Sequence, residues 1–344
     1  MEMPNFGRFA EVLKEQQDNV VGWLRNTPRE KRAVRLGNRP EEAVNEHLRV
    51  LEQGIRKAES KELGVCTVCN EYVEPHWLET NFTNCVCLEH LTGEERSRLE
   101  AELELSQKVQ KALLPQSLPD IPGWELAAFS QPASIVGGDY FDFLRFRDGA
   151  PGLVIADVMG KGMPASMLMA SLQAYLRVIV PESNSPGQVL VRANLLFHHN
   201  IQLTKFVSLV IAQLDQATGT VVYANAGHNP PFVVRRKTNG TREVIPLPPT
   251  GAAIGLVENA SFQIGTVHIA HGDMLVFYTD GIVEATNPAK EEFGEARLRT
   301  FLADYSGGSP AEVIRDLRGN VKQFVSDQPL SDDTTILVCS RSWN

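Results

Sequence analysis

The sequence predicts an α+β protein, with helices layered on antiparallel sheets. From about residue 120 onward, short apolar runs closed by turn residues follow one another as paired strands. Amphipathic segments at 164–180 and 186–203 lie among these strands, and a third at 308–325 precedes the last strand. Residues 6–58, in contrast, have helical spacing. Paired short strands with neighbouring helices favour a layered α+β domain that follows a helical region.

Length and composition limit the class of protein. A chain of 344 residues is long enough for two domains, and 43% apolar with 22% charged residues is typical of a soluble globular protein. The net charge of −9 divides into +2 over residues 1–58 and −11 over the remainder. An acidic larger part argues against nucleic acid as a partner. No apolar run approaches a spanning helix and no signal peptide opens the chain, so we expect a cytoplasmic protein without a membrane segment.

Residues 1–62 form the predicted helical N-terminal region. Apolar residues between positions 6 and 20 approximate one helical stripe. Pro40 then precedes two glutamates, which places proline in a first turn and acids at the positive end of a helix dipole. The second helix has one apolar face, because apolar residues recur at helical spacing: Val44, Leu48, Leu51 and Ile55.

Four of the five cysteines lie between residues 66 and 87. Cys66 and Cys69 form one ligand-x-x-ligand knuckle, and Cys87 with His90 forms a second after seventeen intervening residues. Two such knuckles joined by a short loop are a tetrahedral zinc pattern. In a chain without a secretion signal, the clustering favours a metal over disulfides, and the alternative is a set of unliganded cytosolic thiols.

Residues 63–91 resemble the zinc finger of the DksA/TraR family, which has two CxxC knuckles after a helix. His90 stands where that family has a fourth cysteine, and zinc accepts the exchange. Cys85 and His76 stay open as alternative fourth ligands. The resemblance implies a closed, structural zinc site, and we carry over no polymerase-binding role.

Residues 92–115 are predicted to be a connector helix. Thr92 and Glu95 have the spacing of a capping box, and Pro115 ends the segment. The apolar stripe between them is too imperfect to predict a coiled coil. Residues 116–344 then form the larger domain.

A hairpin of acidic residues is the centre of this larger domain. The apolar run 153–156 leads into Asp157 and a glycine-rich turn, so Asp157 ends a buried strand. Asp139 lies nine residues before Asp148, and Asp157 lies nine residues after it. In a hairpin centred on Asp148, the two carboxylates face each other with Cβ atoms about 5 Å apart. They either share a hard cation, Mg²⁺ or Mn²⁺, or are solvated residues at a sheet edge.

Two more acidic sites stand at strand ends. Asp280 follows the apolar run 274–279, and Asp332 and Asp333 lead into the final strand. Each alone is typical of an ordinary turn. Together with the hairpin, they favour a hard-metal centre with several carboxylate ligands.

Six segments, in order, carry a family resemblance. They are Gln110–Pro115 (QKALLP), 136–142 (VGGDYFD), 156–162 (ADVMGKG), 223–231 (YANAGHNPP), 278–285 (YTDGIVEA) and 332–335 (DDTT). With these segments, residues 105–341 resemble the SpoIIE/RsbU branch of the PPM metal-dependent protein serine/threonine phosphatases. The resemblance implies a β-sandwich flanked by helices, with two Mn²⁺ or Mg²⁺ ions at one end.

The resemblance also implies residue roles. Asp157 would bridge the two metals, with the Val158 carbonyl as a neighbouring ligand and Asp139 and Asp280 as further ligands; Asp139, Asp157 and Asp280 are the candidate catalytic residues. Asp332 would complete the shells, and Asp333 is the alternative. The implied chemistry is hydrolysis of a phosphomonoester by metal-activated water. PPM relatives outside this branch have a histidine at the position of Met159, and we treat His228 as a residue of a structural loop.

The implied substrate is a phosphorylated STAS-type anti-sigma-factor antagonist in a partner-switching pathway. The zinc-finger module would serve sensing or docking, and helices such as 92–114 commonly mediate homodimers in this branch. The competing hypothesis is a weakly catalytic phosphatase-fold scaffold or a regulatory binding protein that acts through its zinc-finger module.

Overall fold

The computed structural model describes residues 5–26, 40–74, 77–78, 82–200, 206–237, 241–326, 328 and 330–342. The chain divides into two compact units, Met1–Glu102 and Leu103–Asn344. Helix α5 (Gly93–Leu113) contains the boundary between them.

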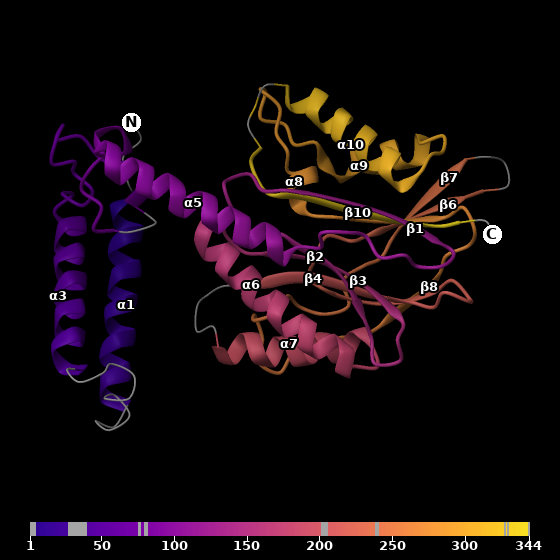
Figure 1. The fold of residues 1–344 in the computed structure, drawn as a ribbon, viewed down its shortest axis with the longest axis horizontal. Helices are drawn as coiled ribbons and strands as arrows, with labels where there is room; N and C mark the ends of the chain where they lie inside the picture. The colour runs from indigo at the N-terminus through magenta and orange to yellow at the C-terminus, as the bar shows by residue number, and fades with distance from the viewer. Residues whose placement is uncertain are drawn as a thin grey trace. The chain divides into compact units, whose positions relative to one another are not determined.

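The first unit contains a pair of long helices, α1 (Phe6–Asn26) and α3 (Pro40–Glu59), seen in Figure 1. The second helix starts at Pro40, as the sequence predicts. Leu13 of α1 packs on Leu51 and Ile55 of α3, which are members of the predicted apolar face. Burial of these apolar faces is what stabilises the pair, because most helical stability in proteins comes from tertiary packing of an amphipathic face.

The segment that carries the cysteines packs on these helices. Leu63, Cys66 and Val73 are buried with Ala10 of α1 and Ala58 of α3. A short 3₁₀ helix, η1 (Leu88–His90), follows, and α5 then begins. The predicted capping box is confirmed: the Thr92 backbone N–H donates to Glu95 Oε2 at 2.9 Å, and the Glu95 backbone N–H donates to Thr92 Oγ1 at 3.2 Å.

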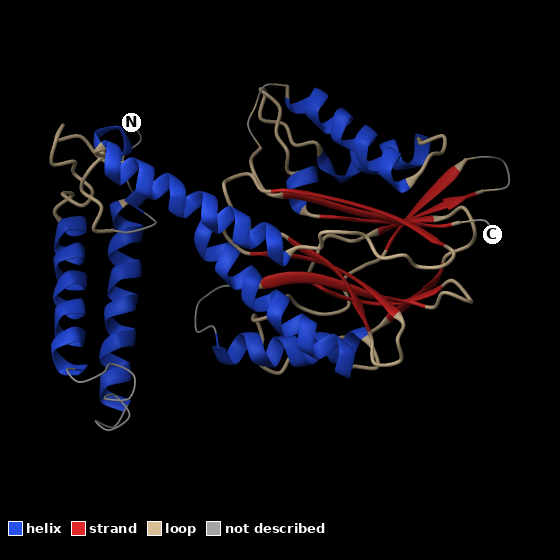
Figure 2. Cartoon of the chain, viewed as in Figure 1, coloured by secondary structure: helices blue, strands red, loops and turns tan. Residues whose placement is uncertain are grey.

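The second unit is a sandwich of two five-stranded antiparallel sheets (Figure 2). One sheet has the order β1 (Trp124–Gln131), β10 (Thr334–Arg341), β9 (Met274–Tyr278), β6 (Phe232–Arg236), β7 (Arg242–Pro246). The other has the order β2 (Tyr140–Arg145), β3 (Pro151–Val158), β4 (Val207–Leu214), β5 (Thr220–Ala226), β8 (Gly265–His268).

Helices cover the outer faces of both sheets. Against the β2–β8 sheet lie α6 (Gly162–Ile179), η2 (Val180–Glu182) and α7 (Pro186–Asn200). Against the other sheet lie α8 (Asp280–Val283), α9 (Gly294–Asp304) and α10 (Pro310–Val325). A third apolar layer fills the space between the sheets. The predicted α+β sandwich flanked by helices is confirmed.

Strand β7 and helix α9 are among the elements that the sequence did not predict. Strand β7 has weak alternation and ends in Pro246, a residue tolerated at a sheet edge. Helix α9 buries only Leu298 and Leu302, so its sequence carries little helical periodicity.

Within the described residues, one segment, Gly162–Glu182, is long and apolar enough to cross a membrane by length and composition. The expectation that no apolar run approaches this length was therefore wrong for this segment. Its apolarity has a packing cause, because Met169, Leu172 and Leu176 are fully buried against the β2–β8 sheet. This is the position of a core helix.

Candidate metal centre and active site

The acidic hairpin has the predicted register. Tyr140 pairs with Ala156 and Phe143 with Leu153, so one further step sets Asp139 opposite Asp157. The turn is shaped by Asp148, whose Oδ1 accepts the Ala150 N–H at 2.9 Å. The two carboxylates therefore stand at the same end of the sandwich.

Asp139 is a buried carboxylate, with 6% of its surface exposed. Its Oδ2 accepts the Thr279 hydroxyl at 2.8 Å, whereas Oδ1 is buried without a hydrogen-bond partner in the described part of the chain. Burial raises the pKa of Asp139 well above its usual value, and the charges of Asp157 and Asp333 raise it further. A buried carboxylate oxygen without a hydrogen-bond partner fits the donor that a hard cation requires.

The pKa values of Asp157 and Asp280 are raised for the same reasons. Burial, followed by the charges of Asp280 and Asp332, raises the pKa of Asp157 to about 7. Burial, with the charge of Glu284, raises the pKa of Asp280 to about 6. Like charges that raise each other's pKa lie near one another, so these strand ends bring their carboxylates together. We call this group, Asp139, Asp157, Asp280 and Asp332, the acidic cluster.

Asp332 and Asp333 have different surroundings. Both oxygens of Asp333 accept backbone N–H groups, from Ala133 at 2.8 Å and from Gly138 at 2.6 Å. Asp332 is 26% exposed and forms an ion pair with Lys161 Nζ at 2.8 Å. Asp333 therefore holds the loop before β2 in place, while Asp332 pairs with the ammonium group of Lys161.

The backbone at Gly138 passes close to the Val158 carbonyl oxygen. A Cβ added at Gly138 would lie 2.7 Å from Val158 O, too close for any side chain. Gln110 of α5 also binds this loop, because its side-chain amide donates to Gly137 O at 2.6 Å and accepts the Gly137 N–H at 3.0 Å. Thr279, Lys161 and Gln110 lie in the quoted sequence motifs, but no pattern assigned them a role.

His228 is fully buried beneath the acidic cluster. Its Nδ1 forms a 2.7 Å hydrogen bond with the hydroxyl of Ser208, which pairs with Asp157 across β3 and β4. Its backbone N–H donates to Asn225 Oδ1 at 2.8 Å. Burial lowers the pKa of His228 to about 4, so the imidazole is neutral near pH 7. These contacts agree with the loop role that the sequence favoured.

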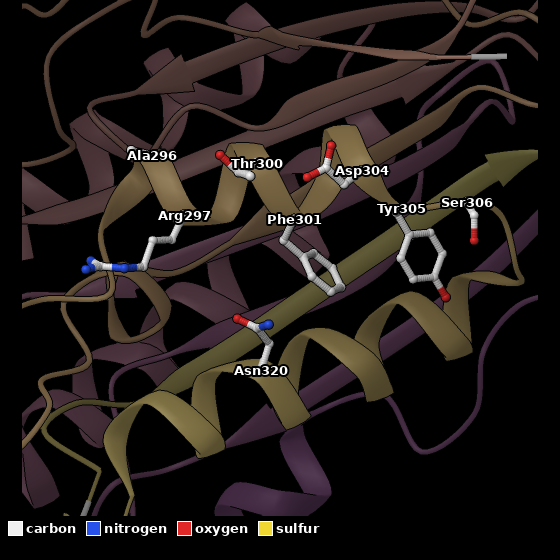
Figure 3. A pocket seen from close by; sticks show the side chains of 8 residues that line it. All are labelled: Ala296, Arg297, Thr300, Phe301, Asp304, Tyr305, Ser306 and Asn320. Carbon is white, nitrogen blue, oxygen red and sulfur yellow. The ribbon is translucent and has the colours of Figure 1, made fainter.

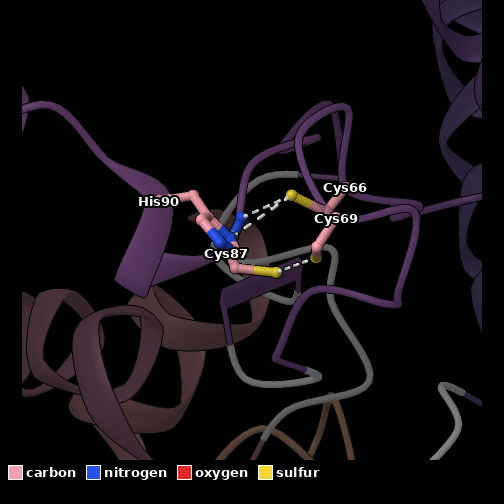
Figure 4. A group of neighbouring side chains, drawn as sticks. All are labelled: Cys66, Cys69, Cys87 and His90. Atoms are coloured by element: carbon pink, nitrogen blue, oxygen red, sulfur yellow. Dashed lines mark hydrogen bonds between the residues drawn. The ribbon is translucent and has the colours of Figure 1, made fainter.

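The first unit contains a separate ligand cluster (Figure 4). The sulfur or nitrogen ligand atoms of Cys66, Cys69, Cys87 and His90 all lie within 4.8 Å of one another. Cys66 Sγ is 3.9 Å from His90 Nδ1, and Cys69 Sγ is 3.7 Å from Cys87 Sγ.

Cysteine protonation differs within this cluster. Burial raises the pKa of the Cys66 thiol, but backbone N–H donors outweigh burial and lower it to about 6. Burial and neighbouring thiols raise the pKa of Cys87 to about 12. Of the alternative fourth ligands, Cys85 is exposed and outside the cluster, and His76 lies outside the described residues.

A surface pocket of about 600 Å³ lies between α9 and α10 (Figure 3). Its walls include Arg297, Phe301, Tyr305 and Asn320, with Asp304 as its one carboxylate residue. It shares no residue with the acidic cluster, and a single carboxylate does not make a metal centre.

Solved structures with similar folds define the class of this domain as PP2C-like. The PP2C domain of SiaA from Pseudomonas aeruginosa matches with a TM-score of 0.63 and 20% identity, covering 71% of this chain and 98% of that one. The RsbU and RsbW domains of Rv1364c from Mycobacterium tuberculosis match with a TM-score of 0.55 and 27% identity, covering 67% of this chain and 63% of that one.

The family model "Stage II sporulation protein E (SpoIIE)" matches residues 147–342. The chain belongs to the SpoIIE family, and the predicted family resemblance is confirmed.

Curated relatives agree with this assignment. Protein IcfG from Synechocystis is 31% identical over 270 residues, covering 70% of this chain and 42% of IcfG. Phosphoserine phosphatase RsbU from Bacillus subtilis is 27% identical over 248 residues, covering 72% of each chain. Phosphoserine phosphatase RsbP from the same organism is 25% identical, and the match covers 53% of RsbP. The chain thus spans less than half of IcfG and about half of RsbP.

Proposed function

We propose that this protein is a metal-dependent protein serine/threonine phosphatase. The observation that carries the proposal is the convergence of Asp139, Asp157, Asp280 and Asp332 at one end of the sandwich, where burial raises the pKa of the first three and one Asp139 oxygen has no hydrogen-bond partner among the described residues. An oxygen-only donor set of this charge fits Mn²⁺ or Mg²⁺. RsbU and RsbP, both named phosphoserine phosphatases, support the same activity.

In this proposal Asp139, Asp157, Asp280, Asp332 and the Val158 carbonyl would hold the two ions, with Asp157 as the central ligand. When bound, the ions would supply positive charge for the phosphoryl oxygens and lower the pKa of a bound water. Asp332 is preferred over Asp333 as a ligand, because the oxygens of Asp333 already accept two backbone N–H groups. Thr279 orients Asp139 through its hydroxyl, and Asp333 holds the loop that presents Asp139.

The proposed substrate is a phosphorylated STAS-type anti-sigma-factor antagonist, in a partner-switching pathway in the cytoplasm. The named phosphoserine phosphatase relatives support a phosphoprotein substrate. The five free cysteines support a reducing compartment.

The N-terminal cluster is proposed to hold one structural zinc ion through Cys66, Cys69, Cys87 and His90. Three sulfurs and one imidazole nitrogen are a closed tetrahedral set. A homodimer through α5 is proposed as well, because Leu105 and Val109 are 62% and 54% exposed on this helix.

The test of the phosphatase proposal is hydrolysis of a phosphorylated STAS protein by the full chain, with and without Mn²⁺. Metal-dependent release of phosphate is the expected result. Binding of the phosphoprotein without any turnover, by a protein that retains Mn²⁺, would instead favour the scaffold hypothesis.

A further inference from the structure

A second pocket, of about 430 Å³, lies at the end of α10 nearest the acidic cluster. Its walls come from α10, from β1 and from the segments that carry the candidate metal ligands. Ile282 is two residues beyond Asp280, and Thr334 follows Asp333 directly. Two residues that line the pocket are therefore close in the chain to candidate ligands of the proposed active site.

One arginine and one lysine side chain give this pocket a positively charged wall. Arg318 and Lys322 are exposed on successive turns of α10, and neither forms an ion pair with another described residue. Arg318 is held in place by its guanidinium, which lies 3.5 Å from the ring centroid of Phe129. Arg315, the third cation of the wall, already pairs with Asp316 at 2.8 Å.

The positive wall is costly to the protein on its own. Like charges four residues apart on a helix repel each other. An anionic ligand would relieve the repulsion.

A residue with a buried hydroxyl, Thr334, lines the pocket. Thr334 is 6% exposed, and its Oγ1 is buried without a hydrogen-bond partner in the part of the chain that the structure describes. The next residues on the same face of β10, Ile336 and Val338, pack in the apolar layer beneath α10. Thr334 is thus a polar residue in this row, at the edge of the apolar layer and beside the pocket.

We propose that this pocket binds an acidic side chain of the phosphoprotein substrate, next to the phosphorylated residue. The carboxylate would accept charge-assisted hydrogen bonds from Arg318 and Lys322. Ile282 and Leu330 would contact the methylene groups of a glutamate. This inference rests on the proposed phosphatase function and adds a substrate preference to it.

The test compares two synthetic phosphoserine peptides, one with glutamates and one with glutamines flanking the phosphoserine. Wild type should show a lower KM for the glutamate peptide. Lys322→Gln should raise that KM about tenfold, as expected for one charge-assisted hydrogen bond, and should leave kcat unchanged. The KM for the glutamine peptide and the rate on p-nitrophenyl phosphate should not change. Lys290→Gln, an exposed lysine outside the pocket, is the matched control.

A binding measurement separates this inference from the phosphatase proposal. Calorimetry with the unphosphorylated glutamate peptide and metal-free protein should show binding that Lys322→Gln weakens. Such binding without hydrolysis of any substrate would reject the phosphatase and keep the pocket. Hydrolysis with equal KM values for both peptides, unaffected by Lys322→Gln, would reject the pocket and keep the phosphatase. Arg318→Gln also loses the contact with Phe129, so Lys322→Gln is the deciding variant.

Discussion

Lys161 supplies positive charge where the proposed metal ions would supply it in the active enzyme. Its ammonium group contacts Asp332 at 2.8 Å and also donates to the Ser331 carbonyl. Its charge lowers the pKa of Asp280, against the larger effects of burial and neighbouring acids. At the residue scale, the acidic cluster is thus partly neutralised before any metal binds.

Replacing Lys161 by methionine should tighten Mn²⁺ binding severalfold. A metal ion must displace the ammonium group from Asp332, and the variant removes that competition. The metal-free variant should lose under about 1 kcal/mol of stability, because the ion pair is largely exposed. Calorimetric titration with Mn²⁺ measures the first effect. Lys237→Met, which removes an ion pair with Glu243 elsewhere in the domain, should leave Mn²⁺ affinity unchanged. Weaker binding in Lys161→Met would contradict the explanation.

Asp157→Asn should abolish phosphatase activity, with a loss on the order of 10²–10³ or more, because the proposed bridging charge is gone. The metal-free variant should be at least as stable as metal-free wild type near pH 7. The raised pKa of Asp157 means that folding favours its protonated form, so stability falls as pH rises from the unfolded value of 3.8 toward about 7.

Thermal melting in chelator, at pH 4.5 and pH 7.5, measures this difference. The melting temperature of wild type should decrease more over this interval than that of Asp157→Asn. A variant that melts well below wild type at the higher pH would show that the Asp157 charge stabilises the fold.

At the scale of elements, α5 contacts the metal-site loop through one side chain. Gln110 forms two hydrogen bonds with Gly137, and Gly138 donates to Asp333 one residue later. The position of this helix and the order of the Asp139 loop are therefore physically connected.

Gln110→Leu should raise the Mn²⁺ concentration needed for half-maximal activity and should destabilise the second unit by about 1–3 kcal/mol, since it leaves buried backbone groups of Gly137 unpaired. Gln116→Leu is the control, because Gln116 also bonds backbone carbonyls but is exposed. A Mn²⁺ titration follows the first effect. An unchanged titration in Gln110→Leu would show that the loop is ordered without α5.

The same helix presents the proposed dimer surface. Leu99 and Leu103 of this helix are half-buried, whereas Leu105 and Val109 are exposed. The double change Leu105→Glu and Val109→Glu should convert a dimer to a monomer in sedimentation velocity. Identical sedimentation of wild type and variant would refute a dimer through this face.

At the scale of the whole molecule, the first compact unit contains the cluster of Cys66, Cys69, Cys87 and His90, and the second contains the carboxylates that we propose as metal ligands. The clusters differ in chemistry: sulfur and imidazole ligands favour zinc, and carboxylates favour harder cations. The two sites should therefore respond to different metals.

Zinc analysis of the full chain should find about one zinc per molecule. Cys66→Ser and Cys87→Ser should release it and lower the melting temperature of the first unit, because metal binding contributes folding energy. Cys85→Ser should retain the zinc, as its exposed thiol lies outside the cluster. Loss of zinc from Cys85→Ser would overturn the ligand assignment.

Local patterns in the sequence were sufficient for the parts of the fold that depend on neighbouring residues. The hairpin register followed from turn chemistry around Asp148, because strand pairing propagates two residues per step from the turn. The helix start at Pro40 and the capping box at Thr92 followed for the same local reason. The six motifs, which occur in the order found in the family, then predicted the β-sandwich.

Only the tertiary structure distinguished Asp332 from Asp333, which are adjacent and chemically alike in the sequence. The difference arises because Asp333 accepts a backbone N–H from Ala133, 200 residues away in the chain. The contact of Lys161 with Asp332 spans 171 positions in the numbering of the chain, and that of Thr279 with Asp139 spans 140. The sequence determined which carboxylates stand at strand ends; packing of the two sheets decided which of them face a cation and which hold the backbone, because hydrogen bonds between distant segments leave no periodicity in the sequence.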